Sequence, residues 1–231
     1  MNYRSEAMSL EGFVQQLASN ILPHGYWFYV TGRVPLGKNP QAIDEKLTTK
    51  YGITISRQQR ARRKLAGLAN LHYLRIGSLW VLLATRGEHR FFAEEAEAIR
   101  DVRKVPLQVG GYSLTVRQGG FLKRLPGEPK QTPDSKRRVR VQIAREKYRD
   151  LKSYFLELST RRAVEEMARE FFGVPFEPYA PIRRQLLNIL RLVNAKRQEA
   201  GLAKVPPTVL RYRRRIVKPF EQQTDRQADA A

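Results

Sequence analysis

The first regularity along the chain is a stretch in which apolar residues recur every three or four positions. Residues Leu10–Ile21 follow this helical spacing, with Ser9 before them as a candidate N-cap. Pro23 and Gly25 interrupt the pattern, and Tyr26–Val34 then combines aromatic with β-branched residues, which is typical of a buried strand. We therefore predict a helix followed by a strand.

Two more helices and a hairpin are predicted next. Asn39 and Pro40 form a favourable helix start, and we expect this helix to stop at Gly52. A second helix is predicted from Ser56 to near Gly67. Two strands joined by a tight turn follow: Leu71–Ile76 and Leu79–Arg86.

The pattern in the middle of the chain predicts shorter elements. We expect a short acidic helix at Glu94–Arg100 and a single strand at Val105–Arg117. Phe121–Leu125 is predicted as another strand, followed by a proline-containing loop at Pro126–Ser135. Arg138–Ile143 alternates apolar and polar residues, which predicts a strand with one solvated face.

Helical spacing returns in the last third of the chain. It predicts helices at Glu146–Leu158, Arg161–Phe172 and Pro181–Ala200, the last of them clearly amphipathic and closed by Gly201. Thr208–Ile216 is short and very basic, and we expect either a short helix or a basic arm there.

This order of elements predicts an α+β fold in which an antiparallel sheet core is followed by a helical C-terminal region. Between residues 26 and 117 the order matches a ferredoxin-like sandwich, which we favour because it accounts for the strands after residue 104. Between residues 10 and 86 it also matches a winged helix, the alternative. We expect a basic core domain at residues 1–143, a helical region with a basic arm at 144–220 and a disordered tail at 221–231.

The charge balance indicates the kind of partner. The chain has 43 Lys and Arg against 22 Asp and Glu, a formal net charge of +21. A polyanion relieves the self-repulsion of such a charge and releases counterions as it binds. Because 42% of the residues are hydrophobic, with 10 Tyr and 10 Phe, a disordered basic tail is excluded. We predict nucleic acid as the partner, either DNA or RNA, with a membrane surface as the minor competitor.

Composition also limits the compartment. The chain contains no cysteine, which excludes disulfide bonds and thiolate metal sites. The N-terminus lacks the apolar core of a signal peptide. Its longest uncharged apolar run, Leu79–Ala84, is too short to cross a bilayer. We expect a cytoplasmic protein that does not bind membranes.

Positive charge is concentrated in one acid-free stretch. Residues 46–86 contain nine Lys or Arg and no Asp or Glu, with the highest density in the helix predicted at Ser56. On a helix, Arg57, Arg60 and Lys64 share one face, from which cationic groups can contact phosphates. Four apolar residues supply the side that we expect to pack on the core: Ile55, Ala61, Leu65 and Leu68.

The same helix carries candidate base-reading residues. Gln58 and Gln59 can contact base edges if the helix lies in a groove. The alternative is a basic face that is merely solvated. We favour a functional face because no acidic residue within the segment is available to pair with these cations.

Two later segments extend the predicted interface. In an edge strand Arg138 and Arg140 share one face, although such charges also protect edges from aggregation. In the arm at Leu210–Ile216, Tyr212 can stack on a base, unless the arm is only a solubilising tail. The full set of predicted nucleic-acid contacts is Arg57, Arg60, Arg62, Arg63, Lys64, Arg75, Arg138, Arg140, Arg211, Tyr212, Arg213, Arg214 and Arg215.

The aromatic strand offers a second possible platform. Alternation places Tyr26 and Phe28 on one face, and Trp27 and Tyr29 on the other. One face must belong to the core. The other is either a surface on which RNA bases stack or a face covered by the first helix, and we favour core.

Catalytic residues are sparse. Of the three histidines, His24, His72 and His89, no two have the spacing of paired metal ligands. Glu88 and His89, with Glu94 and Glu95 nearby, form a candidate acid–base cluster, and His24 is the other candidate. No Gly-Lys-Ser/Thr phosphate loop is present. We expect no metal or other cofactor, and leave enzymatic activity open but less favoured than binding.

The sequence therefore predicts a nucleic-acid-binding protein that grips the phosphate backbone through a basic helix and an arm. An accessory or initiator factor of a mobile element, or a component of an RNA–protein assembly, fits this description. One alternative is a nuclease or nicking enzyme that acts on RNA or single-stranded DNA. Another is an interaction subunit of a larger ribonucleoprotein, docked through the amphipathic helix Pro181–Ala200.

Overall fold

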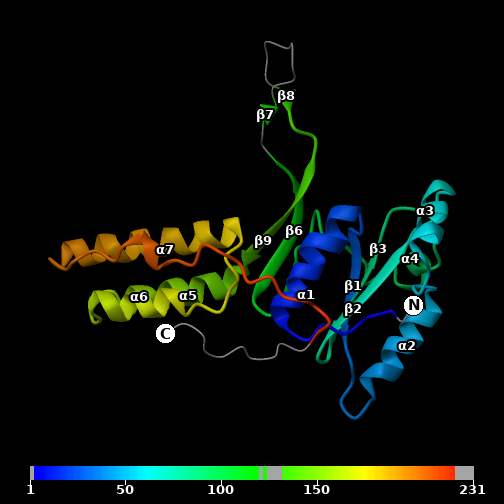
Figure 1. Ribbon diagram of the computed structural model, residues 1–231, viewed down its shortest axis with the longest axis horizontal. Coiled ribbons are helices and arrows are strands. Elements are labelled where there is room, and N and C mark those ends of the chain that lie inside the picture. Colours follow the sequence, from blue (N-terminus) through cyan, green and yellow to red (C-terminus); the bar gives the residue numbers. More distant parts are fainter. Residues whose placement is uncertain (1–2, 120–121, 124–131, 222–231) are drawn as a thin grey trace. The chain divides into compact units, whose positions relative to one another are not determined.

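The computed structural model describes residues 3–119, 122–123 and 132–221 (Figure 1). It combines α-helices with antiparallel sheets, so the predicted α+β class is confirmed. The chain divides into two compact units, which are described separately below. Unit 1 comprises Met1–Pro106, Thr115–Val139 and Val217–Ala231, and unit 2 comprises Leu107–Leu114 and Arg140–Ile216.

Unit 1 begins with the predicted first helix. α1 (Leu10–Gln16) is capped by Ser9, whose Oγ accepts a hydrogen bond from the Gly12 amide at 3.1 Å. The helix continues as a π-helical segment (Leu17–Ile21) and a short 3₁₀ turn (Leu22–His24). The predicted helix is thus confirmed, with a wider last turn.

A four-stranded antiparallel sheet follows, in the order β2-β3-β1-β4. Ala84 lies opposite Phe28 on one side and Leu71 on the other, which fixes the register of β1, β3 and β2. Both predicted folds contain these three strands, so their presence alone does not choose between them. The strands are β1 (Phe28–Arg33), β2 (Leu71–Ile76), β3 (Leu79–Ala84) and β4 (Arg100–Asp101).

Three helices of unit 1 connect these strands: α2 (Pro40–Lys50), α3 (Arg57–Leu65) and α4 (Phe91–Glu94). The Asn39 side chain caps α2 by accepting from the Gln41 amide at 2.9 Å, and proline occupies the first helical position, as predicted. Ser56 and Gln59 form a capping box at the start of α3. Both helix starts are therefore confirmed.

Both faces of the sheet are covered. On one face α1, with its fully buried Phe13, packs toward the strands. On the other face a cluster forms between the sheet, the end of α2 and α4. Tyr29 and Val30 of β1 are consequently almost inaccessible, which confirms that this aromatic strand is core. The cluster consists of Val30, Tyr51, Ile53, Leu71, Tyr73, Leu82, Ala84 and Phe91.

Two predicted elements in the middle of the chain are wrong. The acidic segment Glu94–Arg100 is not a helix: α4 ends at Glu94, and Arg100 pairs with Tyr29 in β4. The helix forms earlier because Phe91 is the side chain that the core buries. Val105–Arg117 is not one strand, because Gly110 and Gly111 have φ values of +52° and +82° and turn the chain.

That turn produces a hairpin. β5 (Leu107–Val109) and β6 (Tyr112–Gln118) are antiparallel, and β9 (Arg137–Ile143) completes a sheet with the order β5-β6-β9. β6 and β9 each contribute residues to both units. β7 (Leu122–Lys123) and β8 (Thr132–Pro133) form a separate pair, so part of the predicted loop is a strand. The other residues of the predicted strand Phe121–Leu125, and residues 126–131 of the predicted loop, lie outside the described residues.

Unit 2 contains the three predicted C-terminal helices. They are α5 (Arg145–Leu158), α6 (Val164–Phe172) and α7 (Ala180–Glu199). Phe155 of α5 and Phe171 of α6 stack with their ring centroids 4.0 Å apart. The apolar side of α7 is buried through Ile182, Leu186, Ile189, Leu190 and Val193.

After α7 the chain returns alongside that helix as an extended segment, drawn in orange in Figure 1. The predicted helix at Thr208–Ile216 is wrong, and the predicted arm is what forms. A single 3₁₀ turn, Pro207–Val209, precedes extended backbone. Consecutive prolines at 206 and 207 remove amide donors, and Arg211 binds the carbonyls of Val174 and Phe176, which keeps the arm extended.

The last described residues belong to unit 1. Gln15 of α1 accepts from and donates to the backbone of Val217, and the Met8 amide donates to Pro219 at 2.8 Å. Gly12 permits this contact, because a Cβ there would lie 2.9 Å from Pro219 Cα. The predicted disordered tail, apart from Glu221, lies outside the described residues. Among the described helices none is both long and apolar enough to cross a bilayer.

His72, the second residue of β2, is partly buried among polar groups. Its Nδ1 is 2.8 Å from the Tyr3 hydroxyl, and the Tyr26 ring meets it edge-on with ring centroids 5.1 Å apart. Burial lowers the pKa of His72 to about 4, and the positive charge of Arg60 and the nearby His24 add to the effect.

We predict that this histidine makes the protein less stable as the pH falls from about 6.5 to 4. The unfolded chain takes up a proton at the ordinary pKa, whereas the folded chain does so only near pH 4. The loss approaches about 3 kcal/mol at the lower end. Denaturant unfolding of the wild type and His72→Gln at neutral pH and near pH 4 measures it. The variant should lose about 3 kcal/mol less; equal losses would show that His72 is not held neutral.

Candidate nucleic-acid interface

Polar contacts hold α3 on unit 1, because none of its residues is buried. The guanidinium of Arg60 points inward and donates to the Ile53 carbonyl at 2.7 Å and the Leu71 carbonyl at 2.8 Å. It also donates to the Tyr26 hydroxyl at 3.2 Å. One side chain therefore joins α3 to the turn before it, to the segment that precedes β1 and to the first residue of β2.

A second arginine completes the attachment. Arg63 donates to the Ala69 carbonyl at 2.9 Å, and Asn70 donates from its Nδ2 to the Arg60 carbonyl at 2.9 Å. The Nε of Arg63 is buried and has no hydrogen-bond partner among the described residues. Two of the five basic residues of α3 thus orient the helix rather than face solvent.

This attachment turns the predicted apolar side of α3 away from the core. Leu65 is 90% exposed, and Ala61 and Leu68 are exposed as well. The prediction that these residues pack on the core is wrong. Arg60 and Arg63 lie on the inward side of the helix, and Leu65 lies nearly opposite them at 3.6 residues per turn.

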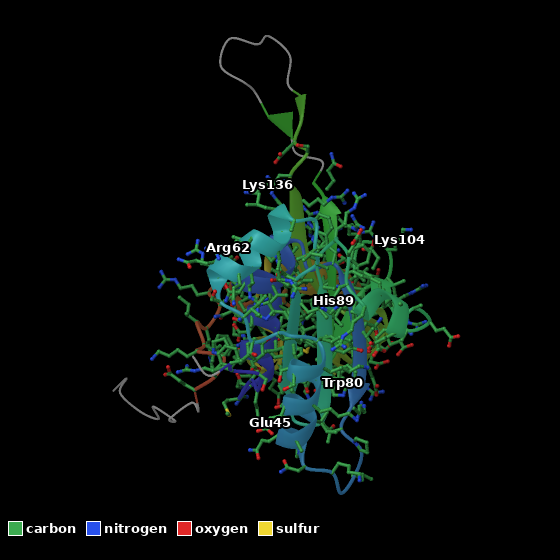
Figure 2. The ribbon with its side chains drawn as sticks, turned by 90° about the vertical axis from the view of Figure 1, so that its right-hand side faces the viewer. Glu45, Arg62, Trp80, His89, Lys104 and Lys136 are labelled. Atoms are coloured by element: carbon green, nitrogen blue, oxygen red, sulfur yellow. The ribbon has the colours of Figure 1, made fainter. Side chains whose placement is uncertain are left out.

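The solvent-exposed surface of α3 carries unpaired cations. Arg57, Arg62 and Lys64 are exposed and form no ion pair with any carboxylate in the described part of the chain. Figure 2 shows Arg62 at the periphery of the unit, whereas Glu45 of α2 lies toward the lower end of the view. Gln58 is exposed, but the Oε1 of Gln59 accepts from the Ser56 amide at 2.8 Å in the capping box.

The next predicted contact, Arg75, lies in the interior. It is 2% exposed, and its Nε donates to Asp44 Oδ1 at 2.8 Å. Its Nη atoms bind Glu6 at 2.9 and 3.0 Å, and the Tyr73 hydroxyl donates to the same Asp44 oxygen. Since every group of this guanidinium has a partner, Arg75 ties the N-terminal segment and α2 to the sheet.

The predicted edge-strand residues alternate as expected. In β9 the side chains of Arg138 and Arg140 are exposed while Val141 is buried. Arg138 forms an ion pair with Asp134. Sequence reasoning missed a neighbouring feature of unit 1, in which the guanidiniums of Arg103 and Arg137 lie 4.6 and 5.3 Å from the Trp27 ring.

The arm of unit 2 separates its predicted residues into two groups. Arg211 faces inward, bound to two carbonyls and 3.7 Å from Glu177. Arg214 lies over the Tyr179 ring at 4.5 Å. The side chains of Tyr212, Arg213 and Arg215 are exposed.

Sequence reasoning also missed a set of arginines on α7. Arg183, Arg184 and Arg191 line a groove of about 600 Å³ together with Tyr212. The signal was present in the sequence, because positions 184, 188 and 191 share one side of a helix whose other side is apolar. Sequence reasoning interpreted this helix from the apolar residues of its opposite side and therefore did not select these arginines.

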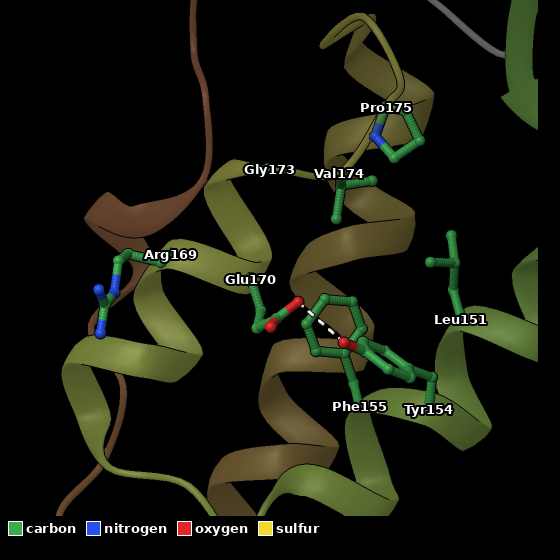
Figure 3. A pocket seen from close by; sticks show the side chains of 8 residues that line it. All are labelled: Leu151, Tyr154, Phe155, Arg169, Glu170, Gly173, Val174 and Pro175. Carbon is green, nitrogen blue, oxygen red and sulfur yellow. Dashed lines mark hydrogen bonds between the residues drawn. The ribbon is translucent and has the colours of Figure 1, made fainter.

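A second concavity in unit 2 has a different character (Figure 3). It has a volume of about 260 Å³ and lies between α5 and α6. The Tyr154 hydroxyl donates to Glu170 Oε2 at 2.9 Å, and this hydrogen bond raises the pKa of Tyr154. A carboxylate in the wall makes this concavity a poor site for a polyanion.

Three of the candidate acid–base groups, His89, Glu94 and Glu95, are engaged in structural contacts. His89 Nδ1 accepts from the Phe91 amide at 3.1 Å, and burial lowers the pKa of His89. Lys50 binds Glu94 at 2.9 Å and holds the pKa of that carboxyl below its usual range. Glu95 accepts from the Tyr51 hydroxyl at 2.6 Å. Within the described ranges no group of three or more His, Asp or Glu residues is arranged to hold a metal ion.

The structure therefore brings three predicted contacts, Arg57, Arg62 and Lys64, together on one helix in unit 1. In unit 2 it places Tyr212 beside arginines that were not predicted. No protein-family model matches the sequence, and no curated protein is significantly similar to it.

We predict that Arg60→Met loosens α3 and lowers the free energy of unfolding by about 2–4 kcal/mol, because buried carbonyls lose their donor. Denaturant unfolding measures the loss, and amide hydrogen exchange should become faster in α3 than in β1–β3. The control is Arg62→Met, which removes an exposed arginine from the same helix and should change stability by less than about 0.5 kcal/mol. Equal effects of the two variants would contradict the anchoring role.

Proposed function

We propose that the protein binds duplex DNA by placing α3 in the major groove. The observation that carries the proposal is the outer face of this helix, where Gln58, Arg62 and Leu65 follow the spacing i, i+4, i+7 and are all exposed. An exposed leucine on the same face as a glutamine and an arginine has no role in the interior of unit 1. It is suited to a surface that presents both hydrogen-bonding groups and methyl groups.

The major groove has this chemistry. Arginine binds the O6 and N7 atoms of guanine with two donors, and glutamine pairs with adenine in the same way. An aliphatic side chain contacts the thymine methyl group. The groove is about 12 Å wide and admits an α-helix. The outer face of α3 thus offers one contact of each kind.

Residues on the flank of α3 can hold the helix in register. Arg57 and Lys64 are seven positions apart, which places them on the same side of the helix, between its inward side and its outer face. Phosphate contacts from such positions fix orientation without reading sequence. The net charge of +21 supplies the long-range attraction.

The order of elements supports the same proposal. Helix, strand, two helices and a hairpin, from α1 to β3, are the elements of a winged helix. α2 and α3 are joined by residues 51–56, as the two helices of a helix-turn-helix are joined by a short turn. In that arrangement the second helix enters the major groove. We propose a variant of the winged-helix arrangement for unit 1, in which β4 is an additional strand beside β1 and α1 covers the face of the sheet opposite α2.

We expect Arg57→Ala/Lys64→Ala to weaken duplex binding and to lower the slope of log K against log [salt] by about two, because each lost phosphate contact removes roughly one counterion. Fluorescence anisotropy with a labelled duplex at several salt concentrations gives the slope. The matched control is Lys38→Ala/Lys46→Ala, which removes the same charge from exposed positions outside α3. An unchanged slope in the α3 variant, or an equal fall in the control, would refute the proposal.

Arg62→Ala should have a different effect, because its proposed contact is with a base edge. After selection of a preferred duplex from a random pool, this variant should lose about 1–3 kcal/mol of binding free energy at that sequence. Binding to unrelated duplexes should change little. Uniform weakening on all duplexes would show that Arg62 contacts phosphate only.

A further inference from the structure

Unit 2 contains a basic groove that α3 and its proposed duplex contacts do not involve. It lies between the N-terminal half of α7 and the arm after it, with a volume of about 600 Å³. Arg183, Arg184 and Arg191 line it, and no carboxylate of the described residues does. Such a lining attracts an anion and offers several guanidinium donors to phosphate oxygens.

The start of α7 adds to the positive potential. No side chain caps this helix, and its first turn contains no acidic residue. The first amide groups of a helix lack internal acceptors and carry the positive end of its dipole. In α7 the second residue, Pro181, contributes no amide proton, so the dipole and the amides of Ala180 and Ile182 supply this potential. Ala180, the first residue of α7, is part of the groove wall.

The aromatic ring of Tyr212 forms the opposite wall. The guanidinium of Arg183 lies over the ring, 4.1 Å from its centroid, and fixes its position. Tyr212 is nevertheless 57% exposed, so it remains accessible to a ligand. A nucleobase stacked on the accessible ring would complete a sandwich of arginine, tyrosine and base.

The spacing of the arginines favours a strand over a mononucleotide. Arg184 and Arg191 are seven residues apart on α7, about 10 Å along the helix axis. That separation suits two different phosphates of one backbone. Stacking on Tyr212 also requires an unpaired base, because the faces of bases within a duplex are already stacked.

We propose that this groove binds single-stranded nucleic acid, with a base on Tyr212 and consecutive phosphates on Arg184 and Arg191. The site is separate from the duplex contact proposed for α3. The groove recognises two features that single-stranded DNA and RNA share, the face of an unpaired base and the phosphate backbone. It therefore accepts strands with deoxyribose and strands with ribose.

The experiment measures binding of labelled oligothymidylate and oligouridylate to the full chain by fluorescence anisotropy. Tyr212→Ala should weaken both by about 10-fold, the range expected for one lost stacking contact, while Tyr212→Trp should retain affinity. The control is Tyr154→Ala, which removes another partly exposed tyrosine from unit 2 and should leave affinity within about 2-fold of the wild type. Weakening by the control equal to that by Tyr212→Ala overturns the proposal.

An oligomer with abasic sites isolates the stacking contact. On that ligand Tyr212→Ala should have less than about a 2-fold effect, because no base remains to stack. The phosphate contacts are tested by Arg184→Ala/Arg191→Ala, which should weaken intact and abasic oligomers alike. Its charge-matched control is Arg149→Ala/Lys204→Ala, whose side chains are exposed outside the groove. A Tyr212 effect of the same size on abasic and intact oligomers would exclude stacking.

The duplex and single-strand measurements test the two proposals independently, so that either proposal can be refuted alone. Loss of the Tyr212 effect with an intact salt-slope change at Arg57 and Lys64 would refute this site and leave the duplex proposal standing. The reverse result would refute the duplex contact alone. The side chain of Tyr212 is exposed, so its variants should unfold at the same denaturant concentration as the wild type.

Discussion

The orientation of α3 depends on two inward-facing guanidiniums, of which Arg60 makes the larger number of contacts and Arg63 donates to the Ala69 carbonyl. Arg60 joins the helix to the Ile53 and Leu71 carbonyls, and no apolar side chain of α3 is buried to assist it. Hydrogen bonds are directional, whereas hydrophobic contacts tolerate rotation. The helix is therefore held at one rotation about its axis. That rotation presents Gln58, Arg62 and Leu65 to solvent, and the proposed DNA contact follows from it.

Arginine has two structural uses throughout the chain. Some guanidiniums replace hydrophobic anchors by satisfying backbone carbonyls: Arg197 donates to the carbonyls of Ser159, Arg162 and Ala203 in unit 2. Others, such as Arg62 and Arg184, face solvent. A formal charge of +21 thus overstates the charge that is free to meet a polyanion at close range. The outward-facing arginines form smaller and more specific surfaces than the composition implies.

Local signals in the sequence predicted the elements well. Asn39 and Ser56 mark helix starts because capping depends on neighbouring residues alone. The apolar residues whose spacing predicted α7 form the buried side of that helix. The direction of each arginine was not predictable. Arg60 and Arg62 have the same side chain on the same helix, and they differ in the acceptors that Arg60 finds outside the helix, at Tyr26, Ile53 and Leu71. The strand predicted through Gly110 failed because two adjacent glycines allowed a turn.

The contact between α1 and Val217–Pro219 has a topological consequence. Because residues on both sides of unit 2 in the sequence belong to unit 1, unit 2 is an insertion and not an appendage. The chain passes from one unit to the other four times, after residues 106, 114, 139 and 216. A chain shortened anywhere within α5–α7 would therefore also lack the segment that covers Gly12, and would expose the surface of α1 that Pro219 contacts.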